Sequence, residues 1–549
     1  MLLRTLATSA LLATPVLAQL PPIQVPSQNP LTPEKVVLGK ILFWDEQLSS
    51  DDSMACGTCH LPEFGGSDPR LTTTAAVNPG PDGFYATADD VHGSPGLVRQ
   101  DSNGDFTPVF NFGLRKQVTG RLANTTLGAA YHDNLFWDSR ASTVFTDPET
   151  NQILMPYGGA LESQAVGPIV SAVEMASEGR TWQDVRQKLQ GRTPLALASN
   201  LTPDIVAALQ QNPTYPLLFT AAFGDPAITA QRIAYAIASY ERTQIPDDTP
   251  WDRFMAGQTA AMSATEQAGW VLFQGPGRCI ACHPDPLFQD EMSHVLGLRP
   301  AREDYGLGAI SNVPIEDGAF KTPTLRNAGL RPRLFHNGQS VALGDPSQAS
   351  DPNSVHNIYL NGGGVDRTNL DAFLLVLSQQ GVTSQDMTTM LEFVRTGLTD
   401  ARCAQALPPF DHPQLRSMTT PTAMAFGPSL AGASEPLLLD TVPSFLGNAD
   451  WKLGLAAGSG NTIAYLGYGL QAMGPGIQYA GIPWHVNVLD GRLLQLLGTP
   501  GSPGLATWRL AIPNDNNLVN LDLYFQLWAF DALAPNGVTT SQGERFTIR

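Results

Sequence analysis

The sequence Cys279-Ile280-Ala281-Cys282-His283 sets the architecture of this chain, and Cys56-Gly57-Thr58-Cys59-His60 repeats its pattern. C-x-x-C-H is the attachment signature of c-type haem. Two cysteines three residues apart lie on one side of a helical turn, where both can form thioethers to one porphyrin, and the neighbouring histidine can reach the iron. We therefore expect two covalently bound c-type haems, with His60 and His283 as proximal ligands to the haem iron.

The same four cysteines allow two other interpretations, a single zinc site or two disulfides. Zinc sites built from two Cys pairs usually have about 15–20 residues between the pairs. Here more than two hundred residues intervene, and a histidine follows each pair. This spacing favours haem over both alternatives. Cys403 is the one remaining cysteine, and we expect it to be a buried, inert thiol.

The first residues have the pattern of a secretory signal. Arg4 is followed by a largely apolar run from Leu6 to Leu12, and the small-residue pattern Val16-Leu17-Ala18 ends the segment. An ordinary apolar N-terminal helix is the alternative, but c-type haem is normally attached outside the cytoplasm. No stretch is long enough to span a membrane. We expect a signal peptide over residues 1–18 and a soluble, periplasmic or secreted mature protein without a membrane span.

Length and charge narrow the remaining choices. A chain of 549 residues should form roughly two to four domains. The net charge of −18 argues against a nucleic-acid partner, which needs a basic surface. It permits a basic partner protein, because opposite charges favour encounter.

Several motifs in sequence order carry a family resemblance. The first is LGKILFWDEQLSSDDSMACGTCH at residues 38–60. The others are LFWDSRA at 135–141, QAVGPI at 164–169 running to Glu174-Met175, KTPTLRN at 321–327 and FHNG at 335–338. Over about residues 30 to 400 the chain resembles the bacterial dihaem cytochrome c peroxidases and the related MauG enzymes.

The resemblance implies a mainly α fold with two cytochrome-c-like haem domains. We place the first, with the peroxidatic haem, at residues 19–245 and the second, with the electron-transfer haem, at 246–415. Helical patterns agree: one opens at Thr32-Pro33, an N-cap followed by a first-turn proline. Further helices are expected near residues 227–238, 263–273, 370–377 and 386–394.

The resemblance also assigns the chemistry. It makes Glu174 the acid–base group beside the first haem, with Gln164 and Pro168 lining the same pocket. Peroxide cleavage needs such a group to take a proton from one oxygen and return it to the other. Trp137 would relay electrons between the haems. Judged by residue type alone, Glu174 would be a surface helix residue, and a lone Trp is more often core.

Two positions depart from the peroxidase pattern. Many peroxidases carry a His that blocks the first haem until the second is reduced, but the aligned segment Phe112–Lys116 has none. His92 and His132 are the nearby candidates for that role. At the sixth ligand of the second haem, Tyr359 stands where peroxidases have Met and MauG-type proteins have Tyr. An ordinary packed Tyr is the alternative, and Met387 or Met390 would then be rival ligands.

Residues 65–120 form an insertion rich in Gly, Pro, Asp and Asn. Its Asp101, Asn103 and Asp105 resemble part of a calcium loop. No Glu completes an EF-hand, so a solvated turn is the stronger expectation. The family's inter-haem calcium would use Asn124 and carbonyls near Arg331 and Arg333, whose two cations argue against it.

The composition changes near Pro408, and residues 416–549 lose helical periodicity. Short apolar or alternating runs separated by turn residues predict a small C-terminal β-sandwich. These runs are 436–439, 462–468, 486–489, 493–497, 507–512 and 521–528. Docking to a surface, a glycan or a partner is one role for the domain and a purely structural role is the other, and its fold does not decide between them.

Taken together, the residues favour a secreted dihaem oxidoreductase that reduces H2O2 at the first haem. Electrons would pass through the second haem from a small cytochrome c or another redox protein. The alternative is a MauG-like oxidase acting on a protein or organic substrate. A non-catalytic electron-transfer or haem-sensing protein is a third interpretation, against which Glu174 and Gln164 argue.

Overall fold

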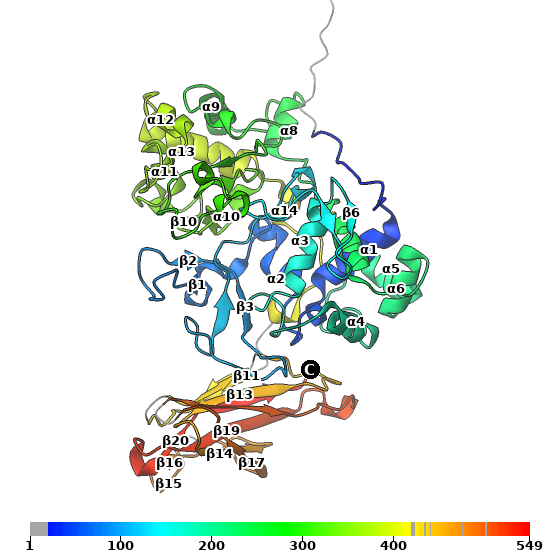
Figure 1. The fold of residues 1–549 in the computed structure, drawn as a ribbon, viewed down its shortest axis with the longest axis vertical. Coiled ribbons are helices and arrows are strands. Elements are labelled where there is room, and N and C mark those ends of the chain that lie inside the picture. The colour runs from blue at the N-terminus through cyan, green and yellow to red at the C-terminus, as the bar shows by residue number, and fades with distance from the viewer. Residues whose placement is uncertain (1–19, 419–422, 433–434, 440, 475, 500–501) are drawn as a thin grey trace, which may run out of the picture.

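A computed structural model describes residues 20–418, 423–432, 435–439, 441–474, 476–499 and 502–549, so the expected signal peptide lies outside the described residues. The chain forms three parts, each with a hydrophobic core of its own (Figure 1). We call them the first helical region (residues 20–245), the second helical region (246–415) and the β region (416–549). None of the described helices is both long and apolar enough to cross a membrane.

The first helical region is built on a pair of packed helices, α1 (Pro33–Trp44) and α7 (Ala230–Glu241). α1 begins where the sequence predicts, because the Thr32 hydroxyl accepts a hydrogen bond from the Lys35 amide and Pro33 occupies the first turn. The other helices of this region are α2 (Cys56–Cys59), α3 (Ala160–Ile169), α4 (Trp182–Gln190), α5 (Pro203–Gln211) and α6 (Tyr215–Phe223). A hairpin of β5 (Phe145–Thr146) and β6 (Ile153–Met155) precedes α3.

The second helical region surrounds a core of aromatic side chains. Its helix α9 (Ala264–Gln274) starts at Ser263, whose side chain accepts from the Glu266 amide in a capping box. The remaining helices are α8 (Pro250–Met255), α10 (Gly308–Ser311), α11 (Val355–Leu360), α12 (Ala372–Ser378), α13 (Ser384–Glu392) and α14 (Ala401–Ala404). Two short antiparallel pairs complete it: β7 (Ser293–His294) with β8 (Phe320–Lys321), and β9 (Arg333–Leu334) with β10 (Ser340–Val341).

The β region contains two antiparallel sheets around one core. The larger sheet has the order β11-β21-β19-β14-β17, with β20 also paired to β19, and the smaller has the order β12-β13-β18. Their bounds are β11 Ala423–Phe426, β12 Leu437–Leu439, β13 Lys452–Ala457, β14 Ile463–Gly469, β17 Asp490–Gln495, β18 Gly504–Arg509, β19 Asp522–Phe530, β20 Val538–Thr540 and β21 Gly543–Thr547. A separate hairpin pairs β15 (Gln478–Tyr479) with β16 (Ile482–Pro483). The expected C-terminal β-rich part is confirmed, but the run at 486–489 is not a strand, since Val486 makes only an isolated bridge with Ala472.

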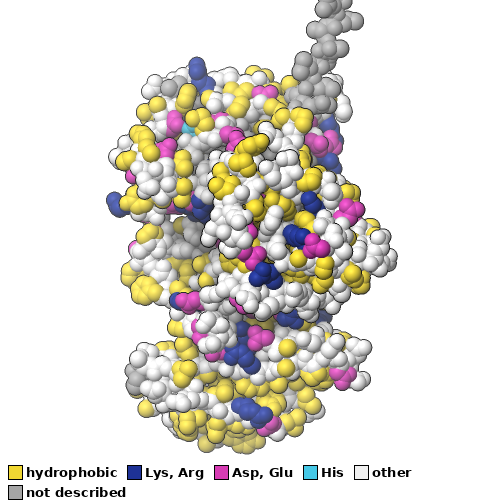
Figure 2. Space-filling model, turned by 45° about the vertical axis from the view of Figure 1, so that its right-hand side comes forward, with side chains coloured by type: hydrophobic (Ala, Val, Ile, Leu, Met, Phe, Trp, Pro, Cys, Tyr) yellow, Lys and Arg dark blue, Asp and Glu magenta, His cyan; other side chains and the backbone are white. Residues whose placement is uncertain are grey.

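The insertion at residues 65–120 joins the β region to the first helical region. It holds β1 (Val77–Asn78), β2 (Val91–His92), β3 (Pro95–Val98) and β4 (Lys116–Val118). Val98 and Phe106 are buried members of the β region's core, and the Phe106 amide donates to the Thr507 hydroxyl at 3.0 Å. Figure 2 shows acidic and basic side chains together where the β region meets the rest of the molecule. The insertion is therefore a docking element as well as a turn-rich loop.

Candidate functional site

Two large cavities hold the two C-x-x-C-H motifs. The first cavity, of about 630 Å³, is lined by Cys56, Cys59 and His60. The second, of about 510 Å³, is lined by Cys279, Cys282 and His283 and is mainly apolar. No disulfide joins the cysteines of either motif. Because the two pairs open into different cavities, they do not form one zinc site, and both cavities have the size of cofactor pockets.

The first motif is held as a single helical turn against α1. Its Gly57 is required by packing, because a Cβ at this position would lie 2.3 Å from the Trp44 ring. Trp44 in turn stacks on His412, with ring centroids 4.0 Å apart. The His60 Nδ1 atom lies 3.1 Å from the Gly66 carbonyl oxygen. That hydrogen bond fixes the tautomer in which Nε2 keeps its lone pair for a metal.

The second motif repeats this arrangement on a 3₁₀ turn, Cys279–Ala281. The His283 amide donates to the Cys279 carbonyl at 2.9 Å, and the His283 Nδ1 atom lies 2.9 Å from the Phe288 carbonyl oxygen. Here too the ring presents Nε2 as a ligand atom. Paired thiols, a correctly oriented imidazole and an apolar cavity are what a covalently attached haem requires, so the residues at both sites fit that group.

The proposed acid–base group lines the same cavity as the first motif. Gln164 and Pro168 come from α3, and Glu174 comes from the turn that follows; all three line the first cavity. Burial raises the pKa of the Glu174 carboxyl, while a hydrogen bond with Ser171 and the charge of Arg140 act in the opposite direction. A carboxyl group in this environment can exchange a proton nearer to neutral pH than an exposed glutamate.

Trp137 forms part of the wall between the cavities. It lines both of them, is 6% exposed, and donates from its indole Nε1 atom to the Leu122 carbonyl at 2.8 Å. Its neighbours Phe136 and Ser139 both have positive φ, at 62° and 60°. Non-glycine residues adopt such angles at a cost that the surrounding structure must offset, and they cluster at functional sites.

The two helical regions exchange equivalent hydrogen bonds at this wall. The Lys321 amide donates to the Trp137 carbonyl at 2.8 Å, and the Leu122 amide donates to the His336 carbonyl at 2.7 Å. Phe335, which precedes His336, repeats the positive φ of Phe136, at 70°. Leu135-Phe136-Trp137 and Leu334-Phe335-His336 are therefore matching corners of the two regions, and each region completes the other's wall.

Three candidate ligands for the second haem line the second cavity together. They are Tyr359 on α11 and Met387 and Met390 on α13. Burial raises the pKa of the Tyr359 hydroxyl. The Met390 side chain packs against Gly277, where a Cβ would lie 2.3 Å from its sulfur. The structure thus brings all three to the expected place and leaves Tyr359 as a prediction.

The two histidines considered as blocking ligands differ in position. His92 lies in β2, outside the first cavity, and its amide donates to the Asn337 carbonyl at 2.9 Å. His132 does line the first cavity, but its Nδ1 atom lies 2.6 Å from a Glu291 carboxylate oxygen and 3.1 Å from the Lys321 ammonium. Burial and the Lys321 charge lower the pKa of His132 to about 4. Its ring is therefore held by the second helical region.

The expected calcium ligands have partners within the chain. The Asp101 carboxylate accepts from the Asn103 and Asp105 amides, and Asp105 pairs with Arg509 of the β region, which also bonds the Asn103 carbonyl. Asn124 lines the first cavity, and Arg331 donates to the carbonyl of Ala123 beside it. The acidic loop thus serves in domain contact, and the guanidinium lies beside the Asn124 position.

Two buried ionisable residues at the cavities carry no predicted role. Glu241, at the end of α7, is 2% exposed and lines the first cavity, and its Oε2 atom has no hydrogen-bond partner among the described residues. Burial raises its pKa to about 8. Lys321 lines both cavities and is 3% exposed, and burial lowers its pKa to about 8. In the sequence, the only indication of a role for these two residues is their place in the motifs Tyr240-Glu241-Arg242-Thr243 and KTPTLRN.

Comparison with known proteins gives consistent matches. The family described as di-haem cytochrome c peroxidase matches residues 33–260. The methylamine utilization protein MauG of Methylophilus methylotrophus is 33% identical over 325 residues, which cover 58% of this chain and 73% of that protein. Cytochrome-c peroxidase IdrP1 of Pseudomonas sp. (strain SCT) is 28% identical over 413 residues, or 69% of this chain and 86% of that protein. A solved MauG-like protein associated with microbial copper homeostasis superposes with a TM-score of 0.47 at 23% identity, over 73% of this chain and 97% of the other.

Proposed function

The chain belongs to the di-haem cytochrome c peroxidase and MauG family, and from this premise we propose that it is a secreted or periplasmic peroxidase with two covalent c-type haems. The family relationship establishes a peroxidase-like oxidoreductase with haem cofactors. Covalent attachment at the two motifs, the direction of electron flow and the cellular location are our proposals.

Haem held by Cys56, Cys59 and His60 would supply a redox-active iron for the reaction with peroxide at the first site. The chain's own residues handle the proton. Glu174 takes a proton from one peroxide oxygen and returns it to the departing one, so that water can leave. The Gln164 amide, which lines the same cavity, orients the substrate, and Pro168 in the last turn of α3 lines that cavity as well.

One observation supports the electron path most directly, namely that Trp137 lines both cavities. The buried indole donates to the Leu122 carbonyl, and the Trp137 backbone carbonyl accepts from the Lys321 amide, so the residue is held from both helical regions. Reducing equivalents entering at the second cavity can reach the first through this side chain. The donor in this proposal is a small cytochrome c or another redox protein.

A second candidate is a MauG-like oxidase acting on a protein or organic substrate. The presence of Tyr359 at the second cavity favours it, because an anionic oxygen ligand stabilises ferric iron and lowers the reduction potential. Steady-state H2O2 consumption with a panel of reduced cytochromes and organic donors tests both candidates. Turnover with cytochromes supports the peroxidase and turnover with organic donors alone supports the oxidase. The absence of turnover with every donor would support the third interpretation, a protein that transfers electrons without catalysing peroxide reduction.

A further inference from the structure

The joint between the β region and the first helical region is centred on a buried lysine. Lys452, the first residue of β13, is 1% exposed. Its ammonium lies 2.8 Å from the Gln100 Oε1 atom and 2.7 Å from the Gly104 carbonyl oxygen. Asp450 is more distant at 3.7 Å, and its side chain is 56% exposed. A cation taken this far out of water needs such hydrogen bonds, so the geometry around it is strongly constrained.

Gln100 is also hydrogen-bonded to the segment before Cys56 and to the segment after Glu174. Its Nε2 atom donates to the Asp51 carboxylate at 3.1 Å, and its backbone carbonyl accepts from the Glu178 amide at 2.9 Å. Asp51 lies in the segment that leads into Cys56. Glu178 lies four residues after Glu174, at the start of the next turn. One residue, itself 2% exposed, thus contacts the β region, the haem-attachment segment and the acid–base turn.

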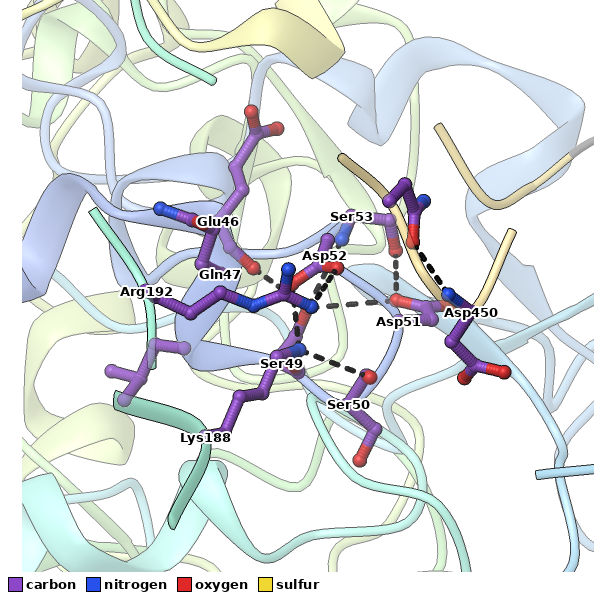
Figure 3. A network of polar contacts seen from close by, with 12 residues as sticks. Glu46, Gln47, Ser49, Ser50, Asp51, Asp52, Ser53, Lys188, Arg192 and Asp450 are labelled. Carbon is purple, nitrogen blue, oxygen red and sulfur yellow. Dashed lines mark hydrogen bonds and ion pairs between the residues drawn. The ribbon is translucent and has the colours of Figure 1, made fainter. Parts of the chain in front are cut away.

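The attachment segment and the acid–base turn are also bonded directly to each other. The Ser50 amide donates to the Met175 carbonyl at 2.8 Å. Within the attachment segment, the Asp51 carboxylate accepts from the Ser53 hydroxyl at 2.6 Å (Figure 3). Asp52 is held in an ion pair by Lys188 at 2.6 Å. A shift of Asp51 would therefore disturb both the Cys56 segment and the segment that carries Glu174.

The lysine also decides which way the Gln100 amide faces. A lysine ammonium has only donors, so the amide oxygen must point toward it and the amide nitrogen must point toward Asp51. Without the ammonium, the reversed amide would aim its oxygen at a carboxylate and lose that bond. The chemistry of Lys452 thus selects the orientation that fits Asp51.

We propose that the β region is a positioning element for the first cavity, in which Lys452 fixes Gln100 and Gln100 holds the Glu174 turn and the Cys56 segment in register. The kinetic part of this proposal rests on the proposed role of Glu174. The positioning itself does not, because it can be measured in the backbone. Lys452 and Gln100 act through other residues and touch neither cavity.

The test compares Lys452→Met with Lys452→Arg in the full-length haem-loaded protein. Met keeps the length and apolar stem but removes the donors, whereas Arg restores donors and charge. Amide hydrogen exchange of residues 171–180 reports opening of the turn. We expect this exchange to accelerate in Lys452→Met and to return toward wild type in Lys452→Arg. The peroxide reaction should slow by about tenfold to a hundredfold, the effect of a small misplacement of a reacting group.

Arg509→Gln is the matched control. It breaks other contacts across the same joint, namely the partly exposed pair with Asp105 and the bond to the Asn103 carbonyl, as well as the pair with Asp450 within the β region. It should change neither the exchange nor the peroxide rate. Gln100→Met removes the other partner of the same hydrogen bond. The double variant with Lys452→Met should show no faster exchange and no slower peroxide reaction than either single variant. If Lys452→Met fails to fold, Gln100→Met alone tests the proposal.

Unchanged exchange at 171–180 in both Lys452→Met and Gln100→Met would overturn the proposal. An equal acceleration of exchange in Arg509→Gln would also overturn the proposal. Any weakening of the contact between the β region and the first helical region would then have the same effect as loss of Lys452. Faster exchange with an unchanged peroxide rate would support the positioning and instead contradict the role of Glu174.

Discussion

Trp137 and His336 face each other edge to face across the wall between the two cavities, with ring centroids 6.4 Å apart. They occupy matching corners of the two helical regions, and the His336 ring stacks on Phe320 at 3.5 Å between centroids. The aromatic contact between the cavities is therefore supplied by both regions, with the indole on the side of the first.

Trp137→Phe should slow turnover with an external donor while leaving the first reaction with peroxide unchanged. The smaller ring loses the hydrogen bond to Leu122 and part of the contact with both cavities, at a cost of about 0.5–3 kcal/mol in stability. Stopped-flow mixing with peroxide and steady-state turnover separate the two steps. Trp484→Phe, in the β region, is the control. Equal turnover by wild type and Trp137→Phe would remove Trp137 from the electron path.

Glu174→Gln should slow peroxide cleavage by about 10²–10⁴-fold, the usual contribution of a positioned acid–base group. In the wild type the rate should rise with pH through the Glu174 pKa, because only the carboxylate accepts a proton. Since burial raises that pKa, the rise should lie above the range of an exposed glutamate. Stopped-flow rates across pH measure both effects, and a persisting pH rise in Glu174→Gln would assign it to another group.

Cys279→Ala or Cys282→Ala should remove the second covalent haem and leave the first. The two motifs lie in separate cavities, so loss of one attachment does not disturb the other. A pyridine haemochrome assay on wild type should give two haems per chain, with one in either variant. One haem or none in the wild type would refute the dihaem proposal.

Tyr359→Phe should change the spectrum and reduction potential of the second haem but not of the first. Loss of an anionic oxygen ligand raises the potential. Met387→Leu and Met390→Leu test the rival ligands, because both side chains line the same cavity. Redox titration followed by optical spectroscopy identifies which variant moves the second haem. Tyr359 is not the ligand if its variant titrates like wild type.

The fully ferric protein should react with H2O2 without prior reduction. His92 lies outside the first cavity and His132 is held by Glu291, so neither is placed as a blocking ligand in this structure. Electron paramagnetic resonance should show a high-spin signal from the first haem. Two low-spin signals, with reactivity appearing only after one-electron reduction, would show a reductive switch, and His92→Ala and then His132→Ala would locate its ligand.

Local chemistry made part of the fold predictable from the sequence. The cap at Thr32-Pro33 places α1, and the box between Ser263 and Glu266 places α9, because both depend on neighbouring residues alone. Strands β13 and β21 were not expected, since their residues lack clear alternation and their pairing depends on distant partners. Burial of all six residues of β13 accounts for the missing alternation in that strand.

At the site too, features that depend on neighbouring residues were predictable and features that depend on distant residues were not. Motif spacing identified both Cys-His sets, and the structure gives each a cavity. The ionisable residues Glu241 and Lys321 could not be assigned, because their burial follows from packing between segments far apart in sequence. Asp105 was expected in a solvated turn, with a calcium site as the alternative. Its pair with Arg509 could not be predicted, because the two residues lie about four hundred positions apart in the sequence.

Phe106 belongs to the insertion in sequence but to the β region in packing. A chain that lost residues 416–549 would expose this side chain, and a chain that lost residues 65–120 would leave a gap in the core it fills. The two segments therefore form one packing unit despite the distance between them. Among natural relatives we expect the insertion and the β region to occur together. A sequence that contains the insertion should therefore also contain the C-terminal β region.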